Sequence, residues 1–253
     1  MTLEGRTIVI TGGGTGIGAA IARAVAAEGA HPVVAGRRPE PLEAVAAETG
    51  GTAHPCDVAD GAQVAGLFEA ARARTSRIEG VVANAGGPGP IAPVAEVEMD
   101  DWAASLGPNL IGAMHTLQHA ARVMVPQGSG SIVVMSSLMG VRGQPMRTAY
   151  CAAKFALVGI AEAMAREVGP AGVRINALLP GAVSGGNMDR ILARRAEAEG
   201  RPVAEIVARD YTEVAALRRW VSPEEVAAAA VWLLSDASAA TTGDRIKVDA
   251  GRF

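Results

Sequence analysis

Two residue types that are rare in this chain stand four positions apart near its middle. Tyrosine occurs only at Tyr150 and Tyr211, and lysine occurs only at Lys154 and Lys247. Tyr150 and Lys154 fall within an alanine-rich helical stretch, where residues at i and i+4 share one face. A cation beside a phenol favours the phenolate, so we expect the pKa of Tyr150 to lie below its usual value of about 10. The pair predicts an acid/base group that acts near neutral pH.

A glycine-rich stretch fills the turn between the first predicted strand and the first predicted helix. It reads T-G-G-G-T-G-I-G over residues 11 to 18, directly after the apolar run Thr7–Ile10. Glycines permit a tight turn and let the backbone approach a pyrophosphate, and the free N–H groups at a helix N-terminus attract an anion. Because a strand precedes this stretch and a helix follows it, we expect it to bind a dinucleotide rather than to form a plain turn.

Short apolar runs alternate with alanine-rich helical stretches along the chain. The predicted strands are Thr7–Ile10, Pro32–Ala35, Thr52–Pro55, Gly80–Ala83, Ser131–Met135, Val173–Leu179 and Ile246–Val248. The predicted helices include Gly16–Glu28, Pro39–Thr49, Gly61–Thr75, Leu110–Val125, Ala149–Val168 and Pro223–Ser235. The alternation predicts βαβ units, and strands without a polar face predict a parallel sheet covered on both sides. We therefore expect one doubly wound, Rossmann-like α/β domain over residues 1–253.

The composition excludes several classes of protein. The chain is 49% apolar and 19% charged, which excludes intrinsic disorder. A net charge of −3 offers no basic face for a nucleic acid. Two cysteines cannot form a disulfide framework, which favours a reducing compartment such as the cytoplasm. The chain has no secretory pattern at its start, and charges interrupt its long apolar stretches, so no membrane span is expected.

The order and spacing of these residues resemble the short-chain dehydrogenase/reductase family. Gly12, Gly16 and Gly18 have the spacing of the family's T-G-x-x-x-G-x-G, and Tyr150 with Lys154 matches its Y-x-x-x-K. The further matches are Ala83–Gly86 against N-N-A-G with its first Asn replaced, Asn109, Ser137 thirteen residues before the tyrosine, Asn176, Pro180–Gly181, and V-D-A-G at 248–251. The resemblance implies an NAD(P)-dependent oxidoreductase that interconverts a ketone, or a 3-oxoacyl group, and a secondary alcohol by hydride transfer.

The resemblance also implies a role for each catalytic residue. Tyr150 protonates the carbonyl oxygen as hydride arrives, Ser137 holds that oxygen by a hydrogen bond, and Lys154 tunes the tyrosine and binds the nicotinamide ribose. Asn109 anchors a water-linked proton path through a local distortion of its helix. The preceding Pro108 fits such a distortion, because proline removes an N–H and disfavours helix in the residue before it. The family spacing selects Ser137 over the adjacent serine at position 136.

The end of the second predicted strand bears on the choice of cofactor. Dinucleotide folds specific for NAD place an acid there to bind the adenosine ribose 2′-hydroxyl, but this strand runs into Gly36-Arg37-Arg38. A guanidinium binds a 2′-phosphate with charge-assisted hydrogen bonds, so we expect NADP, with NAD as the alternative. The implied cofactor-binding residues are Gly12, Gly14, Thr15, Gly16, Ile17, Gly18, Arg37, Arg38, Asp57, Val58, Asn84, Ala85, Gly86, Tyr150, Lys154, Pro180, Gly181, Val183 and Ser184.

Three further features lead to expectations about assembly, gating and metals. The predicted helices at 110–125 and 149–168 carry few charges even on their outer sides, which predicts a homotetramer, or a homodimer, joined through them. The arginine-rich segment 184–220 interrupts the strand–helix alternation and is expected to be a mobile lid over the site. His115 and His119 have i, i+4 spacing but no third ligand in sight, so we expect no metal.

Two alternative functions stay open. The chain could be a catalytically silent dinucleotide-binding regulator, although such a protein has no need of the complete Ser137, Tyr150 and Lys154 set. It could also be an epimerase or a dehydratase on the same fold, which the compact length and the glycine spacing disfavour. The partner is expected to be a small carbonyl or alcohol substrate, and no residue pattern identifies it.

Overall fold

Seven parallel strands form a single sheet in the computed structural model, which describes residues 2–252 apart from the side chains at positions 186, 187, 190, 194, 198 and 199. The strand order is β3-β2-β1-β4-β5-β6-β7, and every pairing is parallel. The strands are β1 (Thr7–Thr11), β2 (His31–Gly36), β3 (Thr52–Pro55), β4 (Gly80–Ala83), β5 (Gly130–Met135), β6 (Val173–Pro180) and β7 (Arg245–Val248). The doubly wound parallel sheet expected from the sequence is confirmed.

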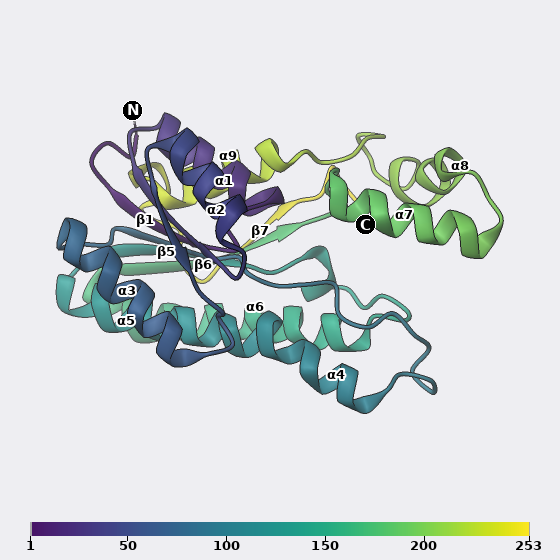
Figure 1. Cartoon of the computed structure of the whole chain (residues 1–253), viewed down its shortest axis with the longest axis horizontal. Coiled ribbons are helices and arrows are strands. Elements are labelled where there is room, and N and C mark those ends of the chain that lie inside the picture. The colour runs from purple at the N-terminus through teal and green to yellow at the C-terminus, as the bar shows by residue number, and fades with distance from the viewer. Residues whose placement is uncertain (1, 253) are drawn as a thin grey trace.

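Helices cover both faces of the sheet. One face carries α1 (Gly16–Ala27), α2 (Pro39–Thr49) and α9 (Pro223–Leu234), and the other carries α3 (Gly61–Thr75), α5 (Gly112–Gln127) and α6 (Thr148–Val168) (Figure 1). Successive side chains of β1 enter opposite clusters: Val9 packs towards α3, α5 and α6, whereas Ile8 and Ile10 pack towards α1, α2 and α9. This two-sided burial explains why the strands lack a polar face.

A helix that was not predicted leads into the helical distortion expected at Asn109. The helix α4 (Met99–Leu106) continues into a five-residue π-helix, Gly107–Ile111, before α5 begins at Gly112. The helix is short and none of its residues is buried, although Met99, Trp102 and Leu106 form an apolar stripe at helical spacing. Pro108 is the second residue of the π-helix, where its missing N–H fits a widened turn. The predicted helix start at Leu110 therefore falls inside the distorted turn.

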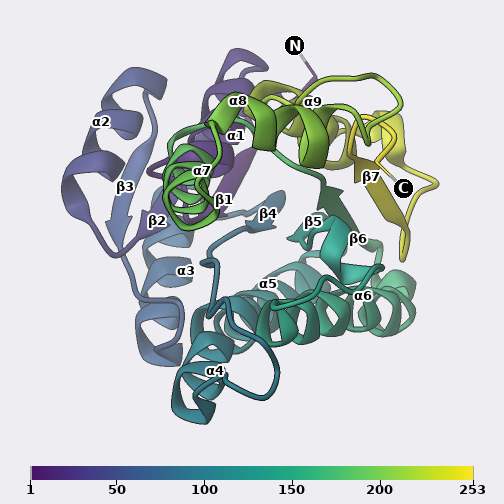
Figure 2. The same ribbon diagram turned by 90° about the vertical axis from the view of Figure 1, so that its right-hand side faces the viewer.

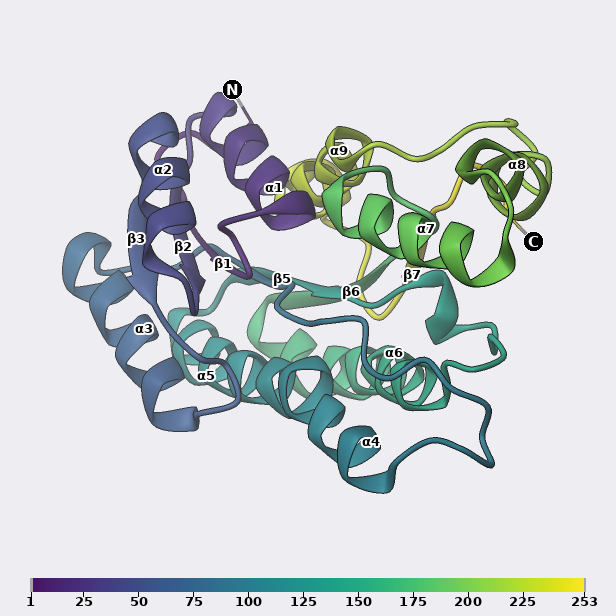
Figure 3. The same cartoon turned by 45° about the vertical axis from the view of Figure 1, so that its right-hand side comes forward.

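The segment 184–220 folds into helices beyond one end of the sheet. It contains α7 (Gly186–Glu199), α8 (Val203–Val207) and a π-turn at Ala208–Thr212. Figure 2 faces this end of the molecule, with α7 and α8 on one side of the strands and α4 on the other, and Figure 3 shows the same segment reaching past the α1 and α9 layer. Side chains of Arg190 and Arg194 lie outside the described part. Its mobility stays a prediction.

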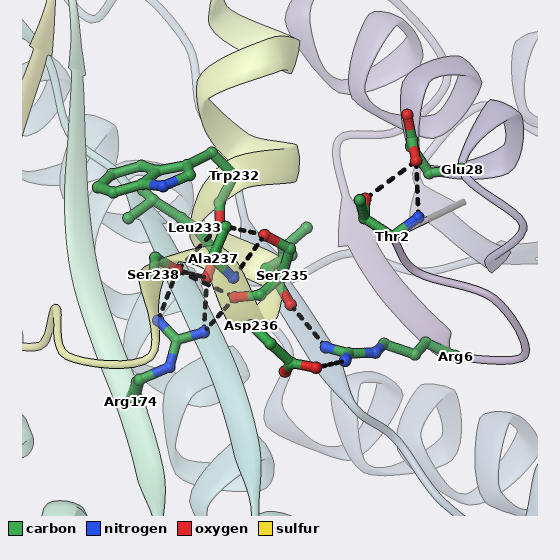
Figure 4. A network of polar contacts seen from close by, with 11 residues as sticks. Thr2, Arg6, Glu28, Arg174, Trp232, Leu233, Ser235, Asp236, Ala237 and Ser238 are labelled. Atoms are coloured by element: carbon green, nitrogen blue, oxygen red, sulfur yellow. Dashed lines mark hydrogen bonds and ion pairs between the residues drawn. The ribbon is translucent and has the colours of Figure 1, made fainter.

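The opposite end of the sheet is closed by an arginine network (Figure 4). Arg6, just before β1, donates to the Leu234 carbonyl at 3.1 Å and pairs with Asp236 at 2.6 Å. Arg174, the second residue of β6, donates to the carbonyls of Leu233 and Ser235 at 2.9 and 3.1 Å. The last carbonyls of a helix have no partner within it, so these guanidinium groups cap α9. This end of the sheet therefore has a structural role.

Candidate active site

The glycine-rich loop joins β1 to α1 at the point where the strand order reverses between β2 and β4. In parallel α/β sheets, ligands bind at the carboxyl ends of the strands beside such a reversal. Gly12 has a φ of +67°, which a side chain would strain, and a Cβ on Gly18 would overlap the carbonyl oxygen of Gly12. The side-chain amide of Asn84 donates to the carbonyl of Thr11 at 2.9 Å. Asn84 therefore braces the loop from the next strand.

A cavity of about 400 Å³ lies beside this loop, at the carboxyl ends of β1 to β4. The predicted cofactor residues that line it are Gly12, Gly14, Thr15, Arg37, Arg38, Asp57, Val58, Ala85 and Gly86. The lining residues that were not predicted are Gly36, Pro41, Leu42, Cys56 and Pro108. Pro41 and Leu42 stand in the first turn of α2, directly after the two arginines, and this position could have identified them as a wall of the same pocket.

The other predicted cofactor residues lie outside this cavity. Gly16, Ile17 and Gly18 form the first turn of α1, and Pro180 ends β6. Past β6 the chain is tied to the region before α9: Val183 bridges to Val221, and the backbone N–H of Ser184 donates to the Val221 carbonyl at 2.9 Å. Gly181 packs against Asp249, after β7. Pro180, Gly181, Val183 and Ser184 thus border the sheet end on the β6 and β7 side, whereas residues 16–18 directly follow the loop that lines the pocket.

Ser137, Tyr150 and Lys154 come together where β5 ends and α6 begins. The hydroxyl of Ser137 faces Tyr150 closely enough to lower the pKa of the phenol, and it accepts the N–H of Met139 at 3.1 Å. The Nζ of Lys154 lies 5.5 Å from the centroid of the Tyr150 ring and donates to the Met135 carbonyl at 2.8 Å. The adjacent Ser136 is buried, and its hydroxyl donates to the Lys154 carbonyl at 2.8 Å. Ser136 thus joins β5 to α6, which leaves Ser137 to face the tyrosine.

The pKa of Tyr150 moves in the direction opposite to the one expected from the sequence. Burial of the phenol raises the pKa, and the hydrogen bond from Ser137 and the positive charge of Arg147 offset that rise only in part. Burial destabilises the phenolate by removing it from water, and this effect is larger than the stabilisation that Ser137 and Arg147 provide. The prediction of a lowered pKa was therefore wrong for the protein without its cofactor. At neutral pH, Tyr150 is a protonated phenol.

Arg147 is a second cation at the tyrosine that the sequence analysis missed. Its guanidinium carbon lies 4.9 Å from the Tyr150 ring centroid, closer than the Nζ of Lys154. It precedes the tyrosine by three residues at the start of α6, a spacing that places two side chains on one helix face. The i, i+3 spacing of Arg147 and Tyr150 was a usable sequence signal, like the i, i+4 spacing of Tyr150 and Lys154.

Burial lowers the pKa of Lys154 from 10.5 to about 8, so its charge costs the fold stability. In the unfolded chain the pKa is about 10.4, so the native state binds this proton more weakly. The penalty is complete below pH 8 and fades as the pH rises towards the unfolded value. A Lys154→Met variant should remove it.

We expect the stability difference between Lys154→Met and wild type to change by on the order of 2 kcal/mol between pH 7 and about pH 9.5. The variant gains relative to wild type at the lower pH, where wild type carries the buried charge. Urea unfolding of both proteins at the two pH values measures this change. A difference that is the same at both pH values would contradict a buried, depressed lysine, whatever its size.

Asn109 links the π-helix to the loop after β4. It is buried, its amide nitrogen donates to the Ser105 carbonyl at 2.9 Å, and its oxygen accepts the N–H of Gly87 at 3.0 Å. A Cβ on Gly86 would lie 2.7 Å from that oxygen and 3.9 Å from the Nζ of Lys154. The local helix distortion expected at Asn109 is present, and the glycine keeps Asn109 and Lys154 close together. The proton path itself stays a prediction.

The two histidines on α5 have structural contacts. The Nδ1 of His115 lies 3.0 Å from the Val58 carbonyl oxygen, and the His119 ring packs on Phe68 with centroids 5.8 Å apart. Within residues 2–252, as far as their side chains are described, no three His, Cys, Asp or Glu residues are grouped to hold a metal ion. Both rings are thus accounted for by packing and by hydrogen bonding to the backbone.

Comparison with known proteins identifies the family to which this fold belongs. The model of the family described as Enoyl-(Acyl carrier protein) reductase matches residues 12–252. A 2,5-dichloro-2,5-cyclohexadiene-1,4-diol dehydrogenase of Sphingobium indicum is 36% identical over 98% of this chain and 97% of its own. Solved structures of levodione reductase (TM-score 0.92, 32% identity, 98% of each chain) and NAD+-bound xylitol dehydrogenase (TM-score 0.93, 30% identity, 99% of this chain and 100% of that one) superpose on it. The chain therefore belongs to the short-chain dehydrogenase/reductase family, and it is an NAD(P)-dependent oxidoreductase that acts on alcohol or ketone groups.

Proposed function

We propose that the enzyme interconverts a small ketone and its secondary alcohol with Tyr150 as the acid/base and NADP as the preferred cofactor. The observation that carries this proposal is the meeting of Ser137, Tyr150 and Lys154 at the carboxyl end of β5. The cofactor supplies the hydride when it is bound. The chain supplies the proton, the orientation of the carbonyl and the charge that favours the phenolate.

The protonation state of Tyr150 suits reduction. A raised pKa keeps its hydroxyl protonated at neutral pH, so it can donate to the carbonyl oxygen while Ser137 holds the same oxygen. The phenolate that is left lies beside two cations, Arg147 and Lys154, which stabilise it until a proton returns. We assign Asn109, which lies beside Gly86 and close to Lys154, to the path by which that proton returns.

The preference for NADP follows from the charges at one end of the cavity. Gly36 stands where an NAD-specific fold places an acid, and Arg37 and Arg38 border the cavity with exposed side chains. Neither arginine has an ion-pair partner in the part of the chain that the structure describes. Two unpaired guanidinium groups favour a 2′-phosphate. NAD stays the alternative, and the ratio of kcat/KM values for NADPH and NADH decides between them.

A screen of ketones and secondary alcohols, followed by nicotinamide absorbance, tests the catalytic proposal. Cofactor-dependent turnover of any member supports it. Tight binding of NADPH without turnover across the panel would favour the catalytically silent regulator. Conversion of a substrate with no net change in nicotinamide absorbance would favour an epimerase or a dehydratase.

The proposed location is the cytoplasm. Both cysteines are free thiols, as a reducing compartment would keep them. The helix α6 and the turn after it, Thr148–Ala171, are long and apolar enough to cross a membrane on length and composition alone. Its inner residues, such as Leu157 and Ala161, are covered by the sheet, so we interpret α6 as a core helix.

We expect the enzyme to be a homotetramer, with a homodimer as the alternative, joined through α5 and α6. Large apolar side chains are exposed there: Ile111 is 46% exposed, Val125 39% and Phe155 45%. Such a surface is usually covered in a soluble protein. Light scattering at micromolar concentration should give about four times the subunit mass of 25.7 kDa. A species with the mass of one subunit would contradict this assembly.

A further inference from the structure

Arg147 occupies a junction between the catalytic tyrosine and the loop that follows β4. One of its terminal nitrogens donates to the Pro88 carbonyl at 2.8 Å, and its guanidinium carbon lies 4.9 Å from the Tyr150 ring centroid. The backbone before it is strained, because Met146 has a φ of +64°. A hydrogen bond from the N–H of Ala92 to the Met146 carbonyl, 3.2 Å long, holds this strained turn against the same loop. Strain of this kind persists where the surrounding structure holds a functional residue in place.

No carboxylate among the described residues compensates the charge of Arg147. The Nε is buried and has no hydrogen-bond partner among the described residues. Within the same residues, no carboxylate lies within ion-pair distance of its guanidinium. The nearest other charge at the tyrosine is Lys154, also a cation. A buried donor without an acceptor is costly, so this site is built to receive one.

We propose that Arg147 binds the carboxylate of an anionic substrate, so that this enzyme acts on short hydroxy acids and oxo acids. This inference rests on the proposed reaction at Tyr150. A carboxylate would accept hydrogen bonds from the guanidinium and neutralise its charge. In reduction, the carbonyl carbon gains a hydride from the reduced cofactor and its oxygen gains the proton of Tyr150, which yields the hydroxy acid and the oxidised cofactor.

The position of Arg147 also limits the length of the substrate. Its guanidinium lies over the ring whose hydroxyl must reach the reacting carbonyl. A carboxylate at the guanidinium and a carbonyl at the hydroxyl are therefore separated by only a few bonds. Oxo acids whose carboxylate and ketone carbons are bonded directly, or are separated by one or two further carbons, cover this range.

A second role for Arg147 predicts a different result. Its positive charge lowers the pKa of Tyr150, so it could act only by tuning the acid. Tuning affects the proton transfer with every substrate, whether charged or neutral. Binding of a carboxylate affects acids alone and acts mainly through KM.

The experiment compares pyruvate, acetoacetate and laevulinate with their methyl esters, which keep the ketone and remove the charge. Each is reduced by wild type, Arg147→Gln and Arg147→Lys, and by Arg72→Gln as a control. Arg72 is an exposed cation on α3, so its removal changes net charge equally at a distant place. The kcat and KM values are measured separately, together with the pH profile of kcat.

We expect wild type to favour at least one acid over its ester by tenfold or more. Arg147→Gln should lower kcat/KM for that acid about ten- to hundredfold more than for its ester, mainly through KM, as expected for loss of a charged hydrogen bond. The ester should lose only the smaller effect of this charge on Tyr150, which appears in kcat. Arg147→Lys should recover part of the loss, and Arg72→Gln should match wild type.

Equal losses on acid and ester in Arg147→Gln, with a shifted pH profile, would overturn the inference in favour of tuning. A wild-type preference for every ester over its acid would also overturn it, while leaving the proposed ketone reduction intact. If wild type reduces neither the acids nor the esters, nor any ketone of the wider panel, the proposed function fails with it.

Discussion

Replacing Tyr150 by phenylalanine should remove nearly all turnover and leave cofactor binding within a few-fold of wild type. The ring that packs between Arg147 and Lys154 is kept, and only the hydroxyl that carries the transferable proton is lost. General acid catalysis by a placed side chain is typically worth about 10²–10⁴-fold in rate. The loss should therefore appear in kcat.

Three measurements separate a chemical effect from a structural one. The thermal midpoint and the NADPH dissociation constant of Tyr150→Phe report folding and cofactor binding, and kcat reports the proton step. A Ser137→Ala variant should also lose turnover, because we propose that Ser137 holds the oxygen that Tyr150 protonates, and it acts on the pKa of the same hydroxyl. If Tyr150→Phe keeps more than about a tenth of the wild-type rate, the loss is under about 1.4 kcal/mol and another group must be the acid.

The helices and strands of this fold could be predicted where burial in the core requires apolar residues. Each predicted strand matches an observed strand to within one residue at either end. In the five inner strands, burial on both faces leaves continuous apolar runs, whereas the edge strands β3 and β7 are partly exposed. The helix α4 was missed although Met99, Trp102 and Leu106 form an apolar stripe at helical spacing, because the helix is short and none of its residues is buried. Its place is held by contacts distant in sequence, such as the 3.1 Å hydrogen bond from the Trp102 indole to Thr148.

The site shows the same division between local and distant causes. Tyr150 and Lys154 could be paired from the sequence because they are neighbours on one helix. The direction of the Tyr150 pKa could not, because burial depends on chain segments that pack around the ring. Arg147 stands three residues before Tyr150, which the sequence shows. The position of its guanidinium, however, is set by a hydrogen bond to the Pro88 carbonyl, 59 residues away in the sequence. Ser136 and Ser137 differ only in where the end of β5 turns each hydroxyl.

Replacing Arg37 by alanine should lower kcat/KM with NADPH about ten- to hundredfold and leave the value with NADH nearly unchanged. One charged hydrogen bond to the 2′-phosphate is worth roughly 1.5–3 kcal/mol, which gives that range. NADH has only a hydroxyl at this position, so it has little to lose. Arg37 follows Gly36 at the end of β2 and borders the cavity, where its exposed side chain has room to meet the phosphate.

An acid introduced at Gly36 should lower kcat/KM with NADPH and raise kcat/KM with NADH. A Cβ at this position meets only Leu42, at 3.7 Å or more, so Gly36→Asp fits without displacing the backbone. The carboxylate would repel a 2′-phosphate and accept a hydrogen bond from a 2′-hydroxyl. The variant should therefore prefer NADH, whereas Arg37→Ala should only weaken the use of NADPH.

The pair of variants distinguishes recognition of the phosphate from a general effect on the turn. Steady-state kinetics with both cofactors, in wild type, Arg37→Ala and Gly36→Asp, measure the two preferences directly. A smaller NADPH-specific loss in Arg38→Ala would place the second arginine at the rim of the same subsite. Equal losses with both cofactors in Arg37→Ala would mean that the turn supports the fold and does not read the phosphate. A wild-type preference for NADH would assign the cavity to NAD, and the two arginines would then be a solvated turn before α2.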